Sequence, residues 1–207
     1  MKTRNFLFTG LLALASTVAA NAQTFDIDML KAQPVYSVEN GQGYDIVAVP
    51  KAKSNAPFFY SVKVADGNYK VTVVLGSKKK AGKTVVRAEN RRLMLDEVST
   101  RKGEFKTYSF IVNKRSPYIT DKMNVKIKPR EKETFTWDEK LTLEFTGAAP
   151  AVKSIKVEPA PAETTTVFLC GNSTVVDQFT EPYASWGHMI TRRFGRRRLS
   201  QTMPKAD

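Results

Sequence analysis

The residue with the clearest potential for chemistry is Ser173, within the stretch VFLCGNSTVVDQ at residues 167–178. The apolar run before it is typical of a strand that is buried on both faces of a parallel sheet. Such a strand would place the hydroxyl at its carboxyl end, where open α/β folds bind their ligands. The pattern favours a nucleophile for acyl transfer, with a simple turn and helix N-cap as the alternative.

A nucleophilic serine needs a base that takes its proton and an acid that orients the base. His188 is the only histidine of the chain, and it lies on a predicted helix shortly after Ser173. A packed or exposed helix histidine is the simpler interpretation of that position. Cys170 is the only cysteine, so neither an internal disulfide nor a His/Cys metal site is expected. We expect no cofactor and a fold that is stabilised by an apolar core.

Residues 23–157 predict the scaffold. FFYSVKVADGNYKVTVVLG contains two runs rich in β-branched and aromatic residues, joined by Asp66, Gly67 and Asn68, which indicates a β-hairpin. EFKTYSFIVN and KLTLEFTG continue the alternation of apolar and polar residues. The pattern predicts a mainly β fold, an antiparallel β-sandwich that is jelly-roll-like and carbohydrate-binding-module-like.

The pattern changes after the sandwich. EPAPAETT, residues 158–165, has the composition of an interdomain linker. Residues 166–194 then indicate the first strand and helix of an α/β domain, with Trp186, Met189 and Phe194 near helical spacing. The residues that remain after Thr166 are fewer than half of the roughly 100 that a domain with its own core needs. We therefore expect this second domain to be incomplete.

VFLCGNSTVVDQ and EPYASWGHMI resemble the first sequence block of the SGNH (GDSL-type) hydrolases. They are more closely similar to bacterial rhamnogalacturonan acetylesterases, which carry a Gly-Asp-Ser-Thr-Val turn and then Ala-Ser-Trp-Gly. The upstream stretch from ENRRLMLDEV to KLTLEFTG is similar to the β-sandwich that precedes this esterase domain in secreted proteins of Bacteroides-type bacteria. The resemblance covers residues 23–194 and implies a flavodoxin-like hydrolase domain that begins at residue 166.

The resemblance also implies roles for individual residues. Ser173 matches the nucleophile, and its backbone N–H matches one oxyanion donor. Asn172 stands where the motif usually has aspartate, a position that is not the nucleophile. The family's other oxyanion donors and its Asp-x-x-His have no counterpart here, and His188 has no catalytic role in the family. We therefore expect a truncated, inactive chain of an esterase that deacetylates a pectin-type plant polysaccharide.

Two other hypotheses concern the sandwich alone. The first is a polysaccharide-binding module without catalysis, in which Trp137, Tyr118 and Tyr60 stack on sugar rings and lysines meet galacturonate carboxylates. Burial in the core is the commoner fate of such aromatic residues. The second is a structural spacer that packs against the complete esterase domain. In a chain without that complete domain, the face of the sandwich that it would cover is exposed.

The two ends of the chain and its charge bear on location and partners. Residues 1–22 have the basic, apolar and small-residue order of a secretory signal peptide, which predicts export to the periplasm or the outside and no transmembrane helix. Residues 195–207 predict a basic, disordered tail or the product of a frameshift, which the gene sequence beyond Phe194 would test. The net charge of +13 suits an acidic polysaccharide, and without a nucleic-acid-binding motif we expect no nucleic-acid partner.

Overall fold

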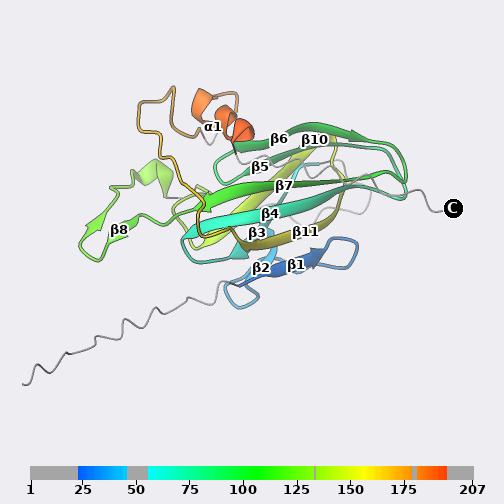
Figure 1. The fold of residues 1–207 in the computed structure, drawn as a ribbon, viewed down its shortest axis with the longest axis horizontal. Coiled ribbons are helices and arrows are strands. Elements are labelled where there is room, and N and C mark those ends of the chain that lie inside the picture. Colours follow the sequence, from blue (N-terminus) through cyan, green and yellow to red (C-terminus); the bar gives the residue numbers. More distant parts are fainter. Residues whose placement is uncertain (1–22, 46–55, 133, 179–180, 195–207) are drawn as a thin grey trace, which may run out of the picture.

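The computed structural model describes residues 23–45, 56–132, 134–178 and 181–194 of the chain. Two antiparallel sheets form the body of the molecule, and the segment that follows them lies against one side of this body (Figure 1). The predicted signal peptide and the predicted basic tail lie outside the described residues.

The first sheet has four strands, in the order β1 (Phe25–Asp28), β11 (Val152–Pro159), β4 (Gly67–Gly76) and β7 (Phe105–Lys114). The second has five, in the order β2 (Gln42–Asp45), β3 (Phe58–Lys63), β10 (Lys140–Ala149), β5 (Gly82–Ala88) and β6 (Arg92–Thr100). All pairings within these sheets are antiparallel. The prediction of a mainly β, antiparallel sandwich is confirmed.

Strand β4 illustrates how the sequence builds the sandwich. Tyr69, Val71, Val73 and Leu75 are buried, whereas the residues that alternate with them are partly exposed. The period of two therefore places one face of the strand in the core. The predicted hairpin between residues 58 and 76 is nevertheless wrong, because β3 and β4 belong to different sheets. Alternation specifies which face is buried, but it does not specify which strand lies alongside.

The core lies between the two sheets and is rich in aromatic rings. Phe58 stacks on Phe145 with 5.0 Å between ring centroids, and Tyr44 contacts Phe58 and Tyr60 edge-on. Tyr60 is 1% exposed, and its hydroxyl donates a hydrogen bond to Gln33 Oε1 at 2.9 Å. Burial raises the pKa of Tyr60 to about 12. This packing makes the sandwich a rigid platform for the loops at its ends.

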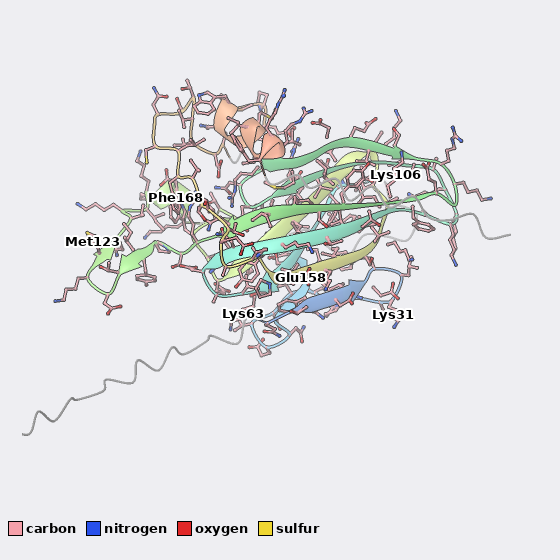
Figure 2. The ribbon with its side chains drawn as sticks, in the orientation of Figure 1. Lys31, Lys63, Lys106, Met123, Glu158 and Phe168 are labelled. Carbon is pink, nitrogen blue, oxygen red and sulfur yellow. The ribbon has the colours of Figure 1, made fainter. Side chains whose placement is uncertain are left out.

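A small hairpin extends from one end of the sandwich. It consists of β8 (Tyr118–Thr120) and β9 (Met123–Asn124), followed by the 3₁₀ turn η1 (Pro129–Glu131). Figure 2 shows Met123 at the tip of this hairpin, far from Lys106 at the opposite end of the molecule. Strand β7 accounts for this separation, because Lys106 lies near its start and the β8–β9 hairpin follows its end.

The segment after the sandwich differs from the predicted start of an α/β domain. Strand β11 continues to Pro159, two residues beyond the predicted sandwich boundary at 157. Residues 160–171 contain no strand, and Val167 and Phe168 are largely exposed, so the predicted buried strand is wrong. A strand buried on both faces needs neighbours on each side, and no described strand pairs with this stretch.

The predicted helix is present in a short form. Helix α1 spans Trp186–Ile190, and the 3₁₀ turn η2 (Thr191–Arg193) follows it directly. The side chain of Ser185 accepts a hydrogen bond from the His188 N–H and caps the helix. Among the described residues, no helix has the length and apolar character needed to cross a membrane.

Candidate functional site

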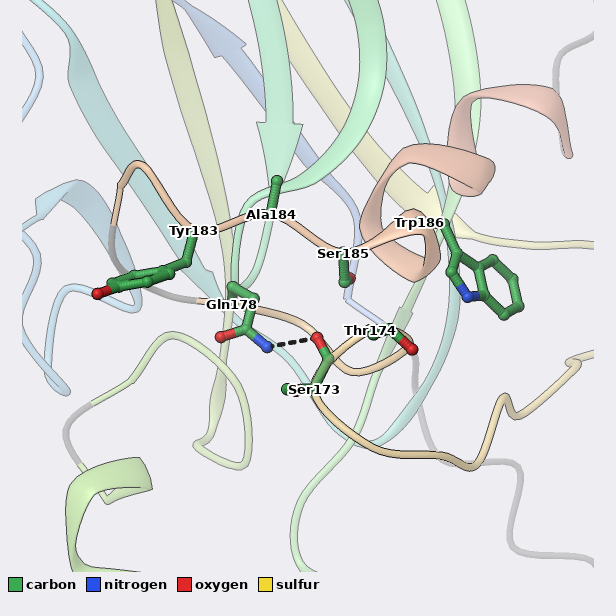
Figure 3. Close-up of a pocket in the computed structure, with 7 residues that line it drawn as sticks. All are labelled: Ser173, Thr174, Gln178, Tyr183, Ala184, Ser185 and Trp186. Carbon is green, nitrogen blue, oxygen red and sulfur yellow. Dashed lines mark hydrogen bonds between the residues drawn. The ribbon is translucent and has the colours of Figure 1, made fainter.

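Ser173 is exposed in a turn that Asn172 organises. Asn172 Oδ1 accepts hydrogen bonds from the Thr174 backbone N–H at 3.0 Å and from the Thr174 hydroxyl at 2.7 Å. The side-chain amide of Gln178 donates to the Ser173 carbonyl at 2.9 Å (Figure 3). A carboxylate oxygen at position 172 would accept the same bonds, so asparagine fills the structural role of an aspartate in this turn.

Helix α1 packs directly on the serine turn. The Ser185 hydroxyl donates to the Val175 carbonyl at 3.2 Å, and the Trp186 N–H donates to the Thr174 carbonyl at 3.1 Å. Gly187 lies so close to Val175 that a Cβ atom at this position would overlap the Val175 carbonyl. The two stretches that carried the sequence resemblance are thus adjacent in space, and glycine permits the close approach.

His188 is a buried, structural residue. Its Nδ1 accepts a hydrogen bond from the Ser185 N–H at 3.3 Å, and its Nε2 lies 3.2 Å from the Gln178 backbone nitrogen and 3.3 Å from the Gln178 carbonyl oxygen. Burial is the main reason that its pKa is lowered. Both ring nitrogens are engaged by backbone groups, so the arrangement fits a packed helix histidine and not a base for Ser173.

An open depression lies beside Ser173. Its lining consists of Ser173, Thr174, Gln178, Tyr183, Ala184, Ser185 and Trp186. Tyr183 and Trp186 lie at opposite ends of this set (Figure 3). The lining offers hydroxyl, amide and aromatic groups but no carboxylate or imidazole. Within the described ranges, no three His, Cys, Asp or Glu residues are grouped to hold a metal ion.

Arginines of the sandwich hold the segment that carries Ser173. Arg91 Nη1 donates to the Gln178 carbonyl at 3.2 Å and to the Tyr183 carbonyl at 2.9 Å, so it bridges two points of the loop. Arg92 Nε lies 3.6 Å from Asp177 Oδ2. These partners are far apart in the sequence, and no periodic pattern marks them. Sequence reasoning therefore missed Arg91 and Arg92.

Further contacts fix the segment along strand β6 and at the start of β4. The Thr191 hydroxyl donates to the Leu93 carbonyl at 2.8 Å, and Arg192 forms an ion pair with Asp96. Nearer the start of the segment, Asn68 Nδ2 donates to the Thr166 hydroxyl at 2.8 Å. The described residues of this segment are therefore attached to the sandwich by hydrogen bonds and ion pairs at several points.

The turn between β5 and β6 has an unusual backbone. Glu89 and Arg91 have φ angles of 55° and 61°, which side-chain-bearing residues adopt infrequently. Glu89 Oε1 accepts from the Thr142 N–H at 3.0 Å, and the Glu89 N–H donates to the Thr142 carbonyl at 2.8 Å. Burial raises the pKa of Glu89 to about 8, which outweighs the attraction of Arg92 Nη2 at 3.8 Å from Oε2. The buried Glu89 thus secures the turn that presents Arg91.

The three aromatic residues predicted to contact sugar lie in different environments. Tyr118 is 72% exposed on β8. Trp137 is partly exposed, and the Arg115 guanidinium lies 4.7 Å from its ring centroid. Tyr60 belongs to the core, so its assignment as a sugar contact is incorrect for the folded chain. The alternation of β3 directs Tyr60 inward, whereas the short β8 leaves Tyr118 uncovered.

The surface around Tyr118 is basic. We define the hairpin patch as Tyr118, Lys122, Lys126 and Lys128, all of which are exposed. Asp121 is the only carboxylate in residues 116–130. The patch therefore joins an uncovered aromatic ring to an excess of positive charge at the end of the sandwich that carries the β8–β9 hairpin.

No family model matches the chain, and no curated protein matches it. Among solved structures, the native structure of a family 35 carbohydrate binding module from Clostridium thermocellum matches with a TM-score of 0.29 and 10% sequence identity. The match covers 66% of this chain and 92% of that chain. A TM-score this low assigns neither fold nor function, and the SGNH resemblance has no support from these comparisons. The β-sandwich assignment rests on the strand order and packing of this chain.

Proposed function

We propose that the protein is a polysaccharide-binding β-sandwich module whose ligand is an acidic, pectin-type polysaccharide. The observation that carries this proposal is the exposed ring of Tyr118, 72% accessible, on a basic hairpin beyond the two sheets. A pyranose ring stacks on an aromatic face through its C–H groups, and lysines attract uronate carboxylates. Export of the chain would bring the hairpin patch to such a polymer outside the cell.

Replacing Tyr118 with alanine is expected to weaken binding to polygalacturonate roughly tenfold, which is the effect of removing a well-placed aromatic contact. A Lys122→Gln/Lys126→Gln variant should also weaken binding and reduce its salt dependence, because two charges that face the polymer are lost. Isothermal titration at low salt measures both effects.

The controls use matched residues away from the hairpin patch. Tyr183→Ala removes an equally large exposed ring from the segment that carries Ser173. Lys78→Gln/Lys79→Gln removes two exposed lysines that follow β4, at the end of that strand away from the hairpin patch. Both control variants should bind like the wild type. An equal loss of affinity in the controls would mean that binding is spread over the whole basic surface, and the assignment to the hairpin patch would fail.

A second candidate function is favoured by the exposed Ser173 turn packed against helix α1. Residues 166–194 would then belong to a carbohydrate esterase that uses Ser173 as its nucleophile and deacetylates a pectin-type polysaccharide. The only histidine of the chain offers Ser173 no base, because the ring nitrogens of His188 bind backbone groups. A positioned general base contributes about 10²- to 10⁴-fold to such reactions.

For this reason we expect no serine-dependent turnover of p-nitrophenyl acetate by the chain. The wild type and Ser173→Ala should release p-nitrophenol at the same slow rate. The chain unfolded in urea serves as the control, because its release of p-nitrophenol measures the direct acylation of lysine amines. Multiple turnovers that disappear in Ser173→Ala would contradict the expectation and establish the esterase function.

A further inference from the structure

We infer that Arg87, Arg91 and Arg92, here called the arginine face, form a carboxylate-binding site for uronate residues. Side-chain and carbonyl oxygens of the same chain occupy this site as an internal ligand, and they belong to Asp177, Gln178, Glu181 and Tyr183. The choice of uronate rests on the proposed function. The site itself is separate from the hairpin patch and stands on its own contacts.

Glu181 occupies the arginine face as a free carboxylate would. Its Oε1 lies 3.0 Å from Arg87 Nη1 and 3.2 Å from Arg91 Nη2. Glu181 is 65% exposed, whereas the side chains of Arg87 and Arg91 are 23% and 14% exposed. Arg87 is also held by Glu144 at 3.2 Å within the sandwich. A largely buried guanidinium pair therefore meets a carboxylate at the surface, where another carboxylate can replace it.

The neutral contacts of the arginine face also suit a sugar acid. Arg91 Nη1 donates to two carbonyl oxygens, those of Gln178 and Tyr183. A uronate presents the same kinds of acceptor, because its carboxylate is flanked by hydroxyl and ring oxygens. The loop thus provides Arg91 with one charged and two uncharged oxygen acceptors.

The balance of charge explains why the face needs an acidic occupant. Within the sandwich, Glu144 is ion-paired to Arg87, and the buried Glu89 has a raised pKa. The segment adds Asp177, beside Arg92, and Glu181. Without these two carboxylates the arginines would outnumber the ionised acids around them, which favours an anionic ligand.

An aromatic residue lies on a loop that is attached to the β5–β6 turn, which fits a saccharide ligand. The Phe135 N–H donates to Asn90 Oδ1 at 3.1 Å, which attaches the loop of Trp137 to the β5–β6 turn. The Trp137 ring is partly exposed and already packs against the Arg115 guanidinium. A partly exposed ring on this loop is suited to contact the pyranose ring of a ligand whose carboxylate meets the arginine face.

The test compares Glu181→Gln with the wild type in titrations with trigalacturonate at low salt. Removing the internal carboxylate should tighten binding roughly three- to tenfold, since an exposed ion pair no longer competes for the arginines. Glu163→Gln, an exposed linker residue with the same charge change, should bind like the wild type. Adding Arg91→Lys to Glu181→Gln should remove the gain, with circular dichroism showing that the sandwich stays folded.

The outcomes separate this inference from the proposed function. Equal affinity of Glu181→Gln and Glu163→Gln overturns the inference, even where Tyr118→Ala shows that the hairpin patch binds polygalacturonate. If Glu181→Gln binds oligoglutamate more tightly than the wild type does but does not bind trigalacturonate more tightly, the assignment of the site to a saccharide is overturned. A gain in Glu181→Gln that survives Tyr118→Ala supports the arginine face as an independent site, whatever the hairpin patch does.

Discussion

Replacing Glu89 with glutamine is expected to remove most of the loss of stability that we expect of the wild-type chain between about pH 4.5 and pH 8. Glu89 is 2% exposed, and burial raises its pKa from 4.5 to about 8. Below pH 4.5 the carboxyl is protonated in both states. Above it, the unfolded chain releases the proton while the folded chain keeps it, so the free energy of unfolding decreases until the folded carboxyl also ionises.

The size of this effect follows from the same shift. Each pKa unit corresponds to about 1.4 kcal/mol, so the free energy of unfolding falls by up to about 5 kcal/mol across the interval. Glutamine cannot ionise, and its carbonyl oxygen can accept the hydrogen bond from Thr142 that Glu89 Oε1 accepts at 3.0 Å. The variant should therefore resemble the wild type at pH 4.5 and be several kcal/mol more stable at pH 8.

Urea denaturation at pH 4.5, 6 and 8 measures the difference, with Glu163→Gln as the control for loss of an exposed carboxylate. The control should follow the wild type at every pH. If Glu89→Gln lost stability with rising pH as steeply as the wild type does, another buried group would be responsible, and the role assigned to Glu89 would be wrong.

Replacing Phe145 with alanine should destabilise the sandwich by about 3–5 kcal/mol at any pH in this range. Phe145 is 0% exposed and stacks on Phe58, its partner in the pairing of β10 with β3. Its removal loses buried apolar area and leaves a cavity between the sheets, because close-packed neighbours relax only in part.

The same denaturation experiment tests this prediction, and Phe194→Ala is the matched control. Phe194 is 69% exposed, so its loss should change the free energy of unfolding by no more than about 0.5 kcal/mol. A loss below 1 kcal/mol in Phe145→Ala would show that the stacked Phe58 and Phe145 rings are not part of the close-packed core between the sheets.

The strands were predictable where one face of each is buried. Tyr69, Val71 and Val73 alternate with more polar residues, and that period alone identifies β4. The partner of a strand was not predictable, because pairing depends on contacts across more than 80 residues, as for Val71 with Val157. Residues 166–170 were wrongly predicted to form a buried strand, because an apolar run is buried only where other elements cover it.

The same distinction between local and long-range contacts applies to the candidate sites. The serine turn was predictable, because Asn172 and Gly187 act through neighbours within a short stretch of chain. The arginine face was not, because the contact between Arg87 and Glu181 joins residues 94 positions apart. Trp137 and Tyr118 were recognised as aromatic candidates, but their exposure depends on the loops around them.

The pairing of the first strand with the last has a consequence for the order of assembly. Phe25 of β1 lies opposite Val157 of β11, and β11 in turn separates β1 from β4. During synthesis, β1 therefore has no neighbour until residues near 157 have emerged, and β4 keeps one edge open for the same period. Closure across such a long loop is slow, on the order of milliseconds to seconds for sandwiches. The segment with Ser173 is made immediately afterwards, so the first sheet closes at nearly the same stage of synthesis at which this segment reaches its contacts on strand β6 of the second sheet.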